Sequence, residues 1–235
     1  MTTDEIMAEL KAMGSESIKK ILLKHGVKEP FFGVKVEQLK TIQKKVKTNY
    51  QLAKDLYATG NADAMYLAGL IADDEKMSKD DLQTWANQAL STNISEYTVP
   101  WVAAGNPSGF ELGLNWIDSD DEHVAAAGWS TLSNWVALRA DDTLDITALK
   151  ALLNRVEKTI HTEKNRVRSL MNGFIIALGT YVTPLTDDAI NTAKTIGAVT
   201  VDMNGTACKV PDAQTYIRKA KDRGTWGKKK KVVKC

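Results

Sequence analysis

The chain has 235 residues, 43% of them hydrophobic, and a formal net charge of +2. This composition provides enough apolar residues for the core of one large or two small domains, and fifteen glycines with only five prolines argue against a low-complexity or an all-β chain. No apolar run approaches the roughly 18 residues that a membrane-spanning helix needs, and the acidic N-terminus, MTTDEIMAEL, lacks the apolar core of a signal peptide.

The cysteines and histidines do not form a metal-binding pattern. The two cysteines, Cys208 and Cys235, lie near the C-terminus, and His25, His123 and His161 are far apart. Because zinc sites need these residues at short, regular spacing, we expect no metal and no cofactor. We interpret the chain as a reduced, cytoplasmic protein that acts as a monomer and has no membrane partner.

Apolar residues recur at helical spacing from the N-terminus to about residue 200, and strand-like alternation is scarce. A loop follows, then a short helix from Asp212, and the basic end DRGTWGKKKKVVKC is expected to be flexible or to dock late. In the second helix, Ile18, Ile21 and Leu22 predict a core stripe. The spacing predicts helices over residues 4–13, 15–24, 36–47, 50–58, 61–72, 79–91, 95–104, from 107, and over 121–138, 145–160, 164–182 and 186–197.

Local signals mark several helix ends. Gly26 is well placed as a left-handed cap, and Asn106-Pro107 predicts an N-cap followed by proline at the first helical position. Pro100 should kink its helix or end it one turn early. Three pairs have the spacing of a helix start, in which a hydroxyl precedes a carboxylate by three residues: Thr2 and Glu5, Ser78 and Asp81, and Ser119 and Glu122.

The stretch from Gly33 to Asp73 organises the chain. It predicts three amphipathic helices joined by very short turns, and none of them can bury its apolar stripe alone. Stacked neighbours must cover one another, as in a solenoid, and pairs of about 40 residues match the period of HEAT-like repeats. We predict an all-α, HEAT-like helical repeat domain, an α-α superhelix, over residues 1–200. Residues 201–235 are expected to form a C-terminal appendage with a short helix and a basic tail.

Charges of opposite sign gather on different parts of the chain. Lysines crowd residues 19–47, and acidic residues crowd 73–81, 118–122 and 141–145. This division suits an anionic partner, and phosphate contacts would add salt dependence without sequence specificity. The cations expected to contact double-stranded DNA are Lys35, Lys40, Lys44, Lys47, Arg155, Lys158, Arg166 and Arg168. The alternatives are solvated helix surfaces, or a HEAT-like scaffold whose concave face binds a protein partner.

Residues within the 33–73 stretch carry a family resemblance. The first feature is a Gly-Val-Lys turn, followed by a helix with a leucine and a basic residue. Next come a helix that ends in Leu-Tyr and a helix rich in Ala, Leu and Ile. In chain order the residues are Gly33, Val34, Lys35, Leu39, Lys40, Leu56, Tyr57, Gly60, Leu70, Ile71 and Asp73. This pattern resembles the AlkD-like DNA alkylation repair proteins, which are HEAT-like repeat DNA glycosylases. The resemblance covers most of residues 1–200. It implies a concave basic surface that holds duplex DNA by its backbone, and base excision repair of N3- and N7-alkylated purines.

The segments that should carry the chemistry of this family depart from its pattern. The resemblance implies an aspartate one helical turn after a tryptophan, an arginine and a second tryptophan. The segment TNISEYTVPW has only Glu96 as a carboxylate, and Trp101 follows it. Ala125 and Ala126 occupy the region expected to hold the arginine, and FIIALGTYV has no tryptophan. We therefore predict a divergent DNA-binding member of the family whose glycosylase activity is weak or lost.

Two further interpretations concern individual side chains. Glu96 could replace the missing aspartate as the catalytic anion of an active glycosylase, or it could be an ordinary solvent-facing glutamate in the first turn of a helix, where the helix dipole favours it. Trp85, Tyr97 and Trp101 could form an aromatic patch that stacks on a cation or a base. The alternative for these rings is core packing.

Overall fold

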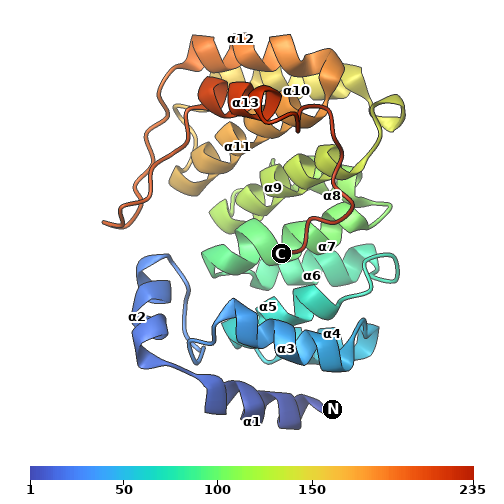
Figure 1. Ribbon diagram of the computed structural model, residues 1–235, viewed down its shortest axis with the longest axis vertical. Coiled ribbons are helices and arrows are strands. Elements are labelled where there is room, and N and C mark those ends of the chain that lie inside the picture. Colours follow the sequence, from blue (N-terminus) through green and yellow to red (C-terminus); the bar gives the residue numbers. More distant parts are fainter.

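The computed structural model describes all residues from 1 to 235, and its regular elements are helices throughout. The helices stack in chain order, from α1 at one end of the molecule to α10 and α12 at the other (Figure 1). The predicted all-α architecture is confirmed. The α-helices are α1 (Thr3–Met13), α2 (Glu16–Lys24), α3 (Val36–Val46), α4 (Tyr50–Ala58), α5 (Ala62–Ile71), α6 (Lys79–Gln88), α7 (Val99–Gly105), α8 (Gly109–Trp116), α9 (Glu122–Leu138), α10 (Ile146–Thr159), α11 (Asn165–Tyr181), α12 (Thr186–Ile196) and α13 (Ala213–Asp222).

Three short turns supplement these helices. A π-helical turn, η1 (Ile94–Thr98), leads directly into α7, and two 3-10 turns, η2 (Asp141–Thr143) and η3 (Thr183–Leu185), precede α10 and α12. No helix is both long enough and apolar enough to cross a membrane.

Two hydrophobic cores hold the stack together, and α9 belongs to both. Val124 and Ala127 of α9 pack into the first core, which α1 and α3 to α8 build, whereas Trp129 and Leu132 pack into the second, which extends to α13. The sides of α9 are thus apolar almost all round, as expected for a central helix. Since each core alone would expose one side of α9, the two halves stabilise each other.

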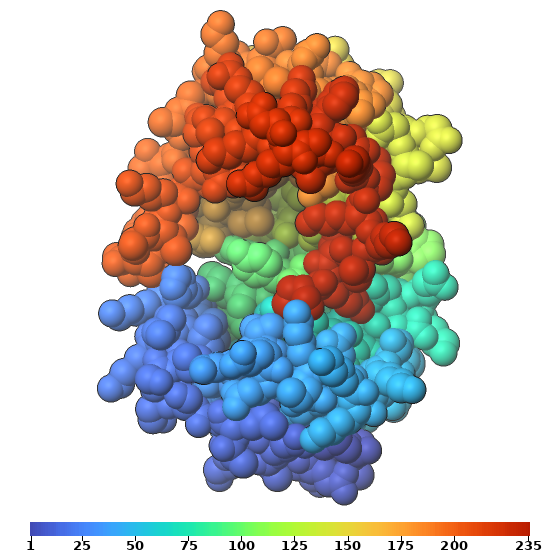
Figure 2. All heavy atoms as spheres, viewed as in Figure 1, coloured from blue at the N-terminus to red at the C-terminus, as the bar shows by residue number.

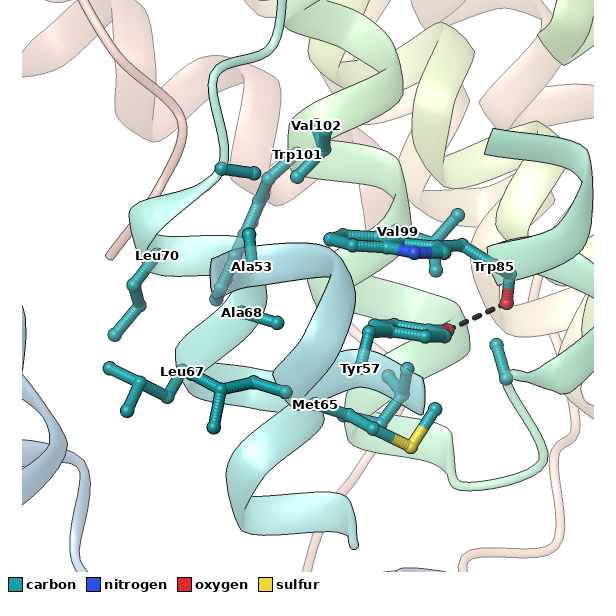
Figure 3. Close-up of a cluster of buried hydrophobic side chains, with 14 of the residues drawn as sticks. Ala53, Tyr57, Met65, Leu67, Ala68, Leu70, Trp85, Val99, Trp101 and Val102 are labelled. Carbon is teal, nitrogen blue, oxygen red and sulfur yellow. Dashed lines mark hydrogen bonds between the residues drawn. The ribbon is translucent and has the colours of Figure 1, made fainter. Parts of the chain in front are cut away.

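The first core contains a stacked aromatic pair between successive helices. The rings of Tyr57 on α4 and Trp85 on α6 lie 4.0 Å apart and nearly parallel. The Tyr57 hydroxyl donates a hydrogen bond of 2.6 Å to the Trp85 carbonyl oxygen (Figure 3). Burial raises the pKa of Tyr57 well above its ordinary value, since a phenolate would lose its hydration there. Trp85 therefore serves the core.

Helices α8 and α9 approach so closely that side chains are excluded at their crossing. A Cβ atom placed on Gly128 would lie 2.7 Å from the Ile117 backbone nitrogen and 3.0 Å from the Gly113 carbonyl oxygen. Backbone atoms cannot move aside as a flexible side chain can, so glycine is required by packing at this point.

The predicted helix starts have mixed outcomes. Thr2 with Glu5 and Ser78 with Asp81 form the expected capping boxes, and Gly26 adopts the left-handed φ of 82°. The Ser119–Glu122 prediction is wrong, because α9 has no side-chain cap and the Ser119 hydroxyl accepts from Asp121 instead.

Two further differences affect single elements. Helix α8 begins at Gly109 rather than at Pro107. The Asn106 Oδ1 still accepts from the Ser108 backbone N–H at 2.9 Å, as an N-cap does, while the Asn106 amide nitrogen donates to the Asp74 and Met77 carbonyl oxygens at 2.7 and 2.8 Å. Helix α6 ends at Gln88, short of the predicted residue 91.

Helix α2 has no buried residue, so the predicted core stripe is wrong. Ile21 and Leu23 are 52% and 46% exposed. Leu22 packs only against a small satellite cluster of Val27, Phe31 and Ala62. The reason is that no other helix covers the apolar side of α2, which stands at the edge of the stack (Figure 1).

The last ten residues, Trp226–Cys235, form what we call the strap. It runs from the second core back to the first along one side of a hollow in the molecule (Figure 2). The Lys230 backbone N–H donates to the Ala137 carbonyl oxygen at 2.7 Å, and Lys229 pairs with Asp141 at 2.8 Å. The basic end is thus docked against the protein. Four lysines in a row do not prevent this, because Asp141 neutralises Lys229 and the Ala137 carbonyl oxygen accepts the Lys230 backbone N–H.

The far end of the strap is attached to the first core. Val233 packs against that core. The Lys234 ammonium group lies 2.6 Å from the Asp74 carboxylate and donates to the Ala72 carbonyl oxygen at 3.0 Å. Burial raises the pKa of Asp74 to about 6, an effect that the neighbouring Lys234 charge reduces but does not cancel.

Candidate nucleic-acid interface

The segment from Ile94 to Gly105 forms the floor of the hollow, and Pro100 controls its conformation. Proline has no N–H, so it cannot donate to the carbonyl oxygen of Glu96, four residues earlier. The Ser130 hydroxyl of α9 donates to that oxygen instead, at 2.6 Å. The chain passes from the π-helical turn η1 into α7 at this point, which agrees with the predicted irregularity at Pro100. Such π turns are frequent at functional sites.

The π turn sends two neighbouring side chains in different directions. Glu96 is 5% exposed, whereas Tyr97 is 53% exposed. The interpretation of Glu96 as a solvent-facing glutamate is therefore wrong. Its carboxylate points into the protein, where the first turn of α11 supplies a partner.

That partner is Arg166, and the two side chains form a bidentate ion pair. The Arg166 Nε donates to Glu96 Oε1 at 2.6 Å, and Nη2 donates to Oε2 at 2.8 Å. The hydrogen bonds from Arg166 to Glu96 raise the pKa of the guanidinium above its ordinary value. The Arg166 backbone N–H donates to Glu122 Oε1 at 2.7 Å, which fixes the start of α11 against the start of α9.

This ion pair lies between two adjoining cavities of about 190 and 290 Å³, which we call the pair cleft. Glu96 and Arg166 line both cavities. The end of α2 contributes Lys24 and His25, and the loop after α12 contributes Met203 and Cys208 on the opposite side. In Figure 2 these two segments, in blue and orange, approach each other beside the hollow. The cleft thus joins segments from both ends of the stack.

Two of the three predicted aromatic side chains lie together. The ring centroids of Tyr97 and Trp101 are 6.2 Å apart, and Tyr66 meets Trp101 edge-on at 5.4 Å. Trp85 lies apart, stacked on Tyr57 in the first core (Figure 3). Tyr66 was missed because nearly all residues of its helix, α5, are apolar, so the sequence does not indicate which of them reach the hollow.

The predicted cations fall into two groups. Lys40, Lys44, Lys47 and Lys158 form no ion pair, and Lys35 has only Glu37 at 3.8 Å. The arginines are engaged within the protein: besides Arg166, Arg155 pairs with Asp118 at 2.6 Å and donates to the Ile117 carbonyl oxygen, and Arg168 donates to Asn165 at 3.3 Å.

Arg155 and Arg166 link separate elements at the edge of the second core, whereas the Arg168 bond lies within α11. The Arg155 guanidinium lies 5.8 Å from the Trp129 ring centroid, so it also covers an aromatic face. On α3, Lys40 and Lys44 form no ion pair, whereas Lys45 pairs with Glu9 at 2.7 Å. No group of three or more metal-ligating side chains comes together anywhere in the protein.

Comparisons with known proteins agree with this architecture. The family described as DNA alkylation repair enzyme matches residues 6–217. Uncharacterized proteins of Listeria monocytogenes (Lmo0209) and Listeria innocua (Lin0241) are each 32% identical over 229 residues, which cover 95% of this chain and 99% of each relative.

A solved structure is similar over the complete length of both chains, with 37% sequence identity and a TM-score of 0.91. It is described as a new family of proteins related to the HEAT-like repeat DNA glycosylases with affinity for branched DNA structures. The fold is therefore the predicted HEAT-like solenoid, and the chain belongs to the DNA alkylation repair enzyme family.

Proposed function

We propose that the protein binds branched DNA and does not excise alkylated bases. The observation that carries the second part is the state of Glu96, the one carboxylate in the segment where the family resemblance implies a catalytic aspartate. Both its oxygens accept hydrogen bonds from Arg166 within a largely buried pair. A carboxylate neutralised in this way cannot also stabilise positive charge on a deoxyribose. To do so it would have to leave Arg166, and breaking a buried pair leaves an uncompensated charge.

The proposed DNA binding is supported by the free lysines. Lys40 and Lys44 lie on α3 and Lys47 is the residue that follows its last turn. None of the three has a carboxylate partner within the protein, so their charges are available for phosphates. The affinity of the similar solved structure for branched DNA indicates the class of DNA. A protein that brings helices from both ends of its chain around one hollow suits a branch point, where duplex arms diverge.

Binding is tested by titrating a forked DNA, a four-way junction and a blunt duplex at several salt concentrations. We expect branched DNA to bind more tightly than the duplex. The affinity should fall steeply with salt, because each phosphate contact releases counterions. Replacing Lys40, Lys44 and Lys47 by alanine should reduce the log–log salt slope by about three if all three contact phosphates. Lys150→Ala is the control, since this exposed lysine is already paired with Asp188 at 3.0 Å.

Excision is tested by measuring release of methylated purines from alkylated DNA. We expect release at the spontaneous rate with wild type and with Glu96→Gln alike. Release above that rate that disappears in Glu96→Gln would contradict the proposal and make Glu96 a catalytic residue. Absence of binding to every DNA at low salt would contradict the binding part.

A further inference from the structure

A separate apolar hollow of about 330 Å³ adjoins the pair cleft. We call it the aromatic pocket. Leu22, Asn93 and Tyr97 line both this pocket and the pair cleft. Its volume is within the range of pockets that hold small flat ligands. Aliphatic and aromatic side chains form most of its walls, and Asp63 and Cys235 also contribute to the lining. The apolar ones include Leu22, Val36, Leu39, Tyr66, Tyr97 and Trp101.

The aromatic side of the pocket consists of an exposed ring, Tyr97, next to a buried ring, Trp101. Trp101 is 5% exposed and is held edge-on by Tyr66. Tyr97 is 53% exposed and meets Trp101 at 6.2 Å. A flat ligand that covers Tyr97 would remove apolar surface from water, and Val36, which lines the same pocket, is also 40% exposed. Large apolar side chains gathered at one opening mark a binding site rather than scattered surface.

The pocket also contains an unused polar group. The Asn93 Oδ1 atom is buried and has no hydrogen-bond partner. An unpaired buried acceptor is unfavourable, and a ligand with an N–H donor relieves it once a rotation of the Asn93 side chain brings Oδ1 to the pocket surface. Nucleobases carry such donors on their edges, and asparagine is a frequent partner of them.

Lysines next in sequence to lining residues of the aromatic pocket favour some apolar ligands over others. Lys35 lies between two pocket residues in sequence, Val34 and Val36, and its side chain is 54% exposed. Lys40 follows the pocket residue Leu39 on α3. An apolar slot next to a segment that carries lysines fits a flat ring attached to a phosphate backbone, since the ring fills the slot and the phosphates meet the cations of that segment.

From this combination we infer that the aromatic pocket takes one unstacked nucleobase from a single-stranded arm of a branched DNA, with Tyr97 stacking on its face. The inference rests on the proposed branched-DNA function. In a blunt duplex every base is paired and stacked, and extracting one costs a few kcal/mol. A single-stranded arm offers its bases without that cost, so the pocket would favour forks over duplexes.

The test compares wild type with Tyr97→Ala and Tyr97→Phe on a fork with single-stranded arms and on a blunt duplex. Tyr216→Ala is the matched control, because Tyr216 is 49% exposed on α13 and lies outside the pocket. Stacking of a base on an aromatic ring contributes about 1–3 kcal/mol. Tyr97→Ala should therefore weaken fork binding by about five-fold or more and leave duplex binding unchanged. Tyr97→Phe and Tyr216→Ala should bind both DNAs as wild type does.

A 2-aminopurine placed in the single-stranded arm next to the branch reports stacking directly. Its fluorescence should fall on binding to wild type and Tyr97→Phe, and should not fall with Tyr97→Ala. Equal loss of fork and duplex binding in Tyr97→Ala, or no loss of either, would overturn the inference.

Val36→Lys separates the pocket from simple charge attraction. The longer side chain fills the opening and adds a cation. If charge alone governs binding, forks should bind as tightly as to wild type or more tightly, and that result would overturn the inference. If a base enters the pocket, fork binding should weaken. Failure of wild type to bind any DNA overturns the proposed function itself, whereas intact binding that is insensitive to Tyr97 overturns only the pocket.

Discussion

Arg166 and Glu96 are 70 positions apart in the chain, yet their side chains form two parallel hydrogen bonds of 2.6 and 2.8 Å. The pair joins the first turn of α11 to the π-helical turn η1. With side-chain exposures of 22% and 5%, it is shielded from the screening that makes surface pairs weak. The Glu96 carboxylate is thus engaged in a contact that links two elements of the fold.

Removing one partner of this pair should destabilise the protein strongly. Arg166→Ala leaves the Glu96 carboxylate buried and unpaired, and we expect a loss of about 3 kcal/mol in the free energy of unfolding, measured by urea denaturation. Lys79→Ala is the control, because Lys79 pairs with Glu111 at 2.6 Å but both side chains are more than half exposed. Lys79→Ala should lower the free energy of unfolding by less than about 1 kcal/mol. Similar losses in both variants would show that the burial of the Glu96 pair has no energetic consequence.

Asp74 should make the stability depend on pH. Its pKa in the folded protein is raised to about 6, above the value of about 3.9 expected for the unfolded chain. The folded state therefore holds its proton more tightly, so this contribution to stability is complete below about pH 4 and is lost as the pH rises through about 6. The loss should approach about 3 kcal/mol.

This prediction is measured as the difference in unfolding free energy between wild type and Asp74→Asn from pH 4.5 to 8. The unfolding free energy of Asp74→Asn relative to that of wild type should increase as the pH rises, because asparagine has no proton to lose. Lys234→Met should steepen the pH dependence of the otherwise wild-type protein, since it removes the charge that lies 2.6 Å from Asp74. A difference that stays constant with pH would contradict the raised pKa.

Two glycines inside long helices should respond in opposite ways to alanine. Gly128→Ala places a Cβ atom 2.7 Å from a backbone nitrogen, and we expect a loss of about 1–3 kcal/mol from overpacking. At Gly173 in α11 a Cβ atom would meet nothing within 4 Å. Gly173→Ala should stabilise the protein by up to about 1 kcal/mol, because alanine favours the helix more than glycine does. Thermal and urea unfolding should show the opposite signs, and equal effects would contradict the close approach of α8 and α9.

The hydroxyl of Tyr57 can be separated from its ring. Tyr57→Phe keeps the stack on Trp85 but removes the donor that lies 2.6 Å from the Trp85 carbonyl oxygen. We expect a loss of about 1–3 kcal/mol in unfolding free energy with little change in tryptophan fluorescence. Tyr57→Ala also leaves a cavity and should cost about 3–5 kcal/mol. If both variants lose the same free energy, the hydroxyl and not the ring accounts for the contribution of Tyr57.

Local patterns predicted most of the helices, because periodic apolar residues and caps such as Ser78 act within a few positions of the chain. The family could be recognised from the turn at Gly33 and the helices after it for the same reason. The burial of Glu96 could not be predicted in this way. It depends on Arg166 and on Ser130, which reach it only after the helices have stacked.

The wrong expectation for α2 and the two alternatives left open for the chain end have a common physical origin. An amphipathic helix has the same sequence pattern whether or not a neighbour covers its apolar side, so Ile21 gave no indication of its exposure. A run of lysines likewise resembles a solvated tail until carboxylates such as Asp141 and Asp74 are brought beside it. Sequence spacing predicts which elements form, but not which of them find partners.

The strap gives this solenoid a fixed span. A stack of helix pairs that touch only their neighbours can open or tighten like an arc, through small rotations distributed over all its members. Here the strap links two separate points of the stack directly. It is attached near Ala137 at one end and at Asp74 at the other. The curvature of the stack between α5 and α9 therefore depends on a short segment that contributes little to either core.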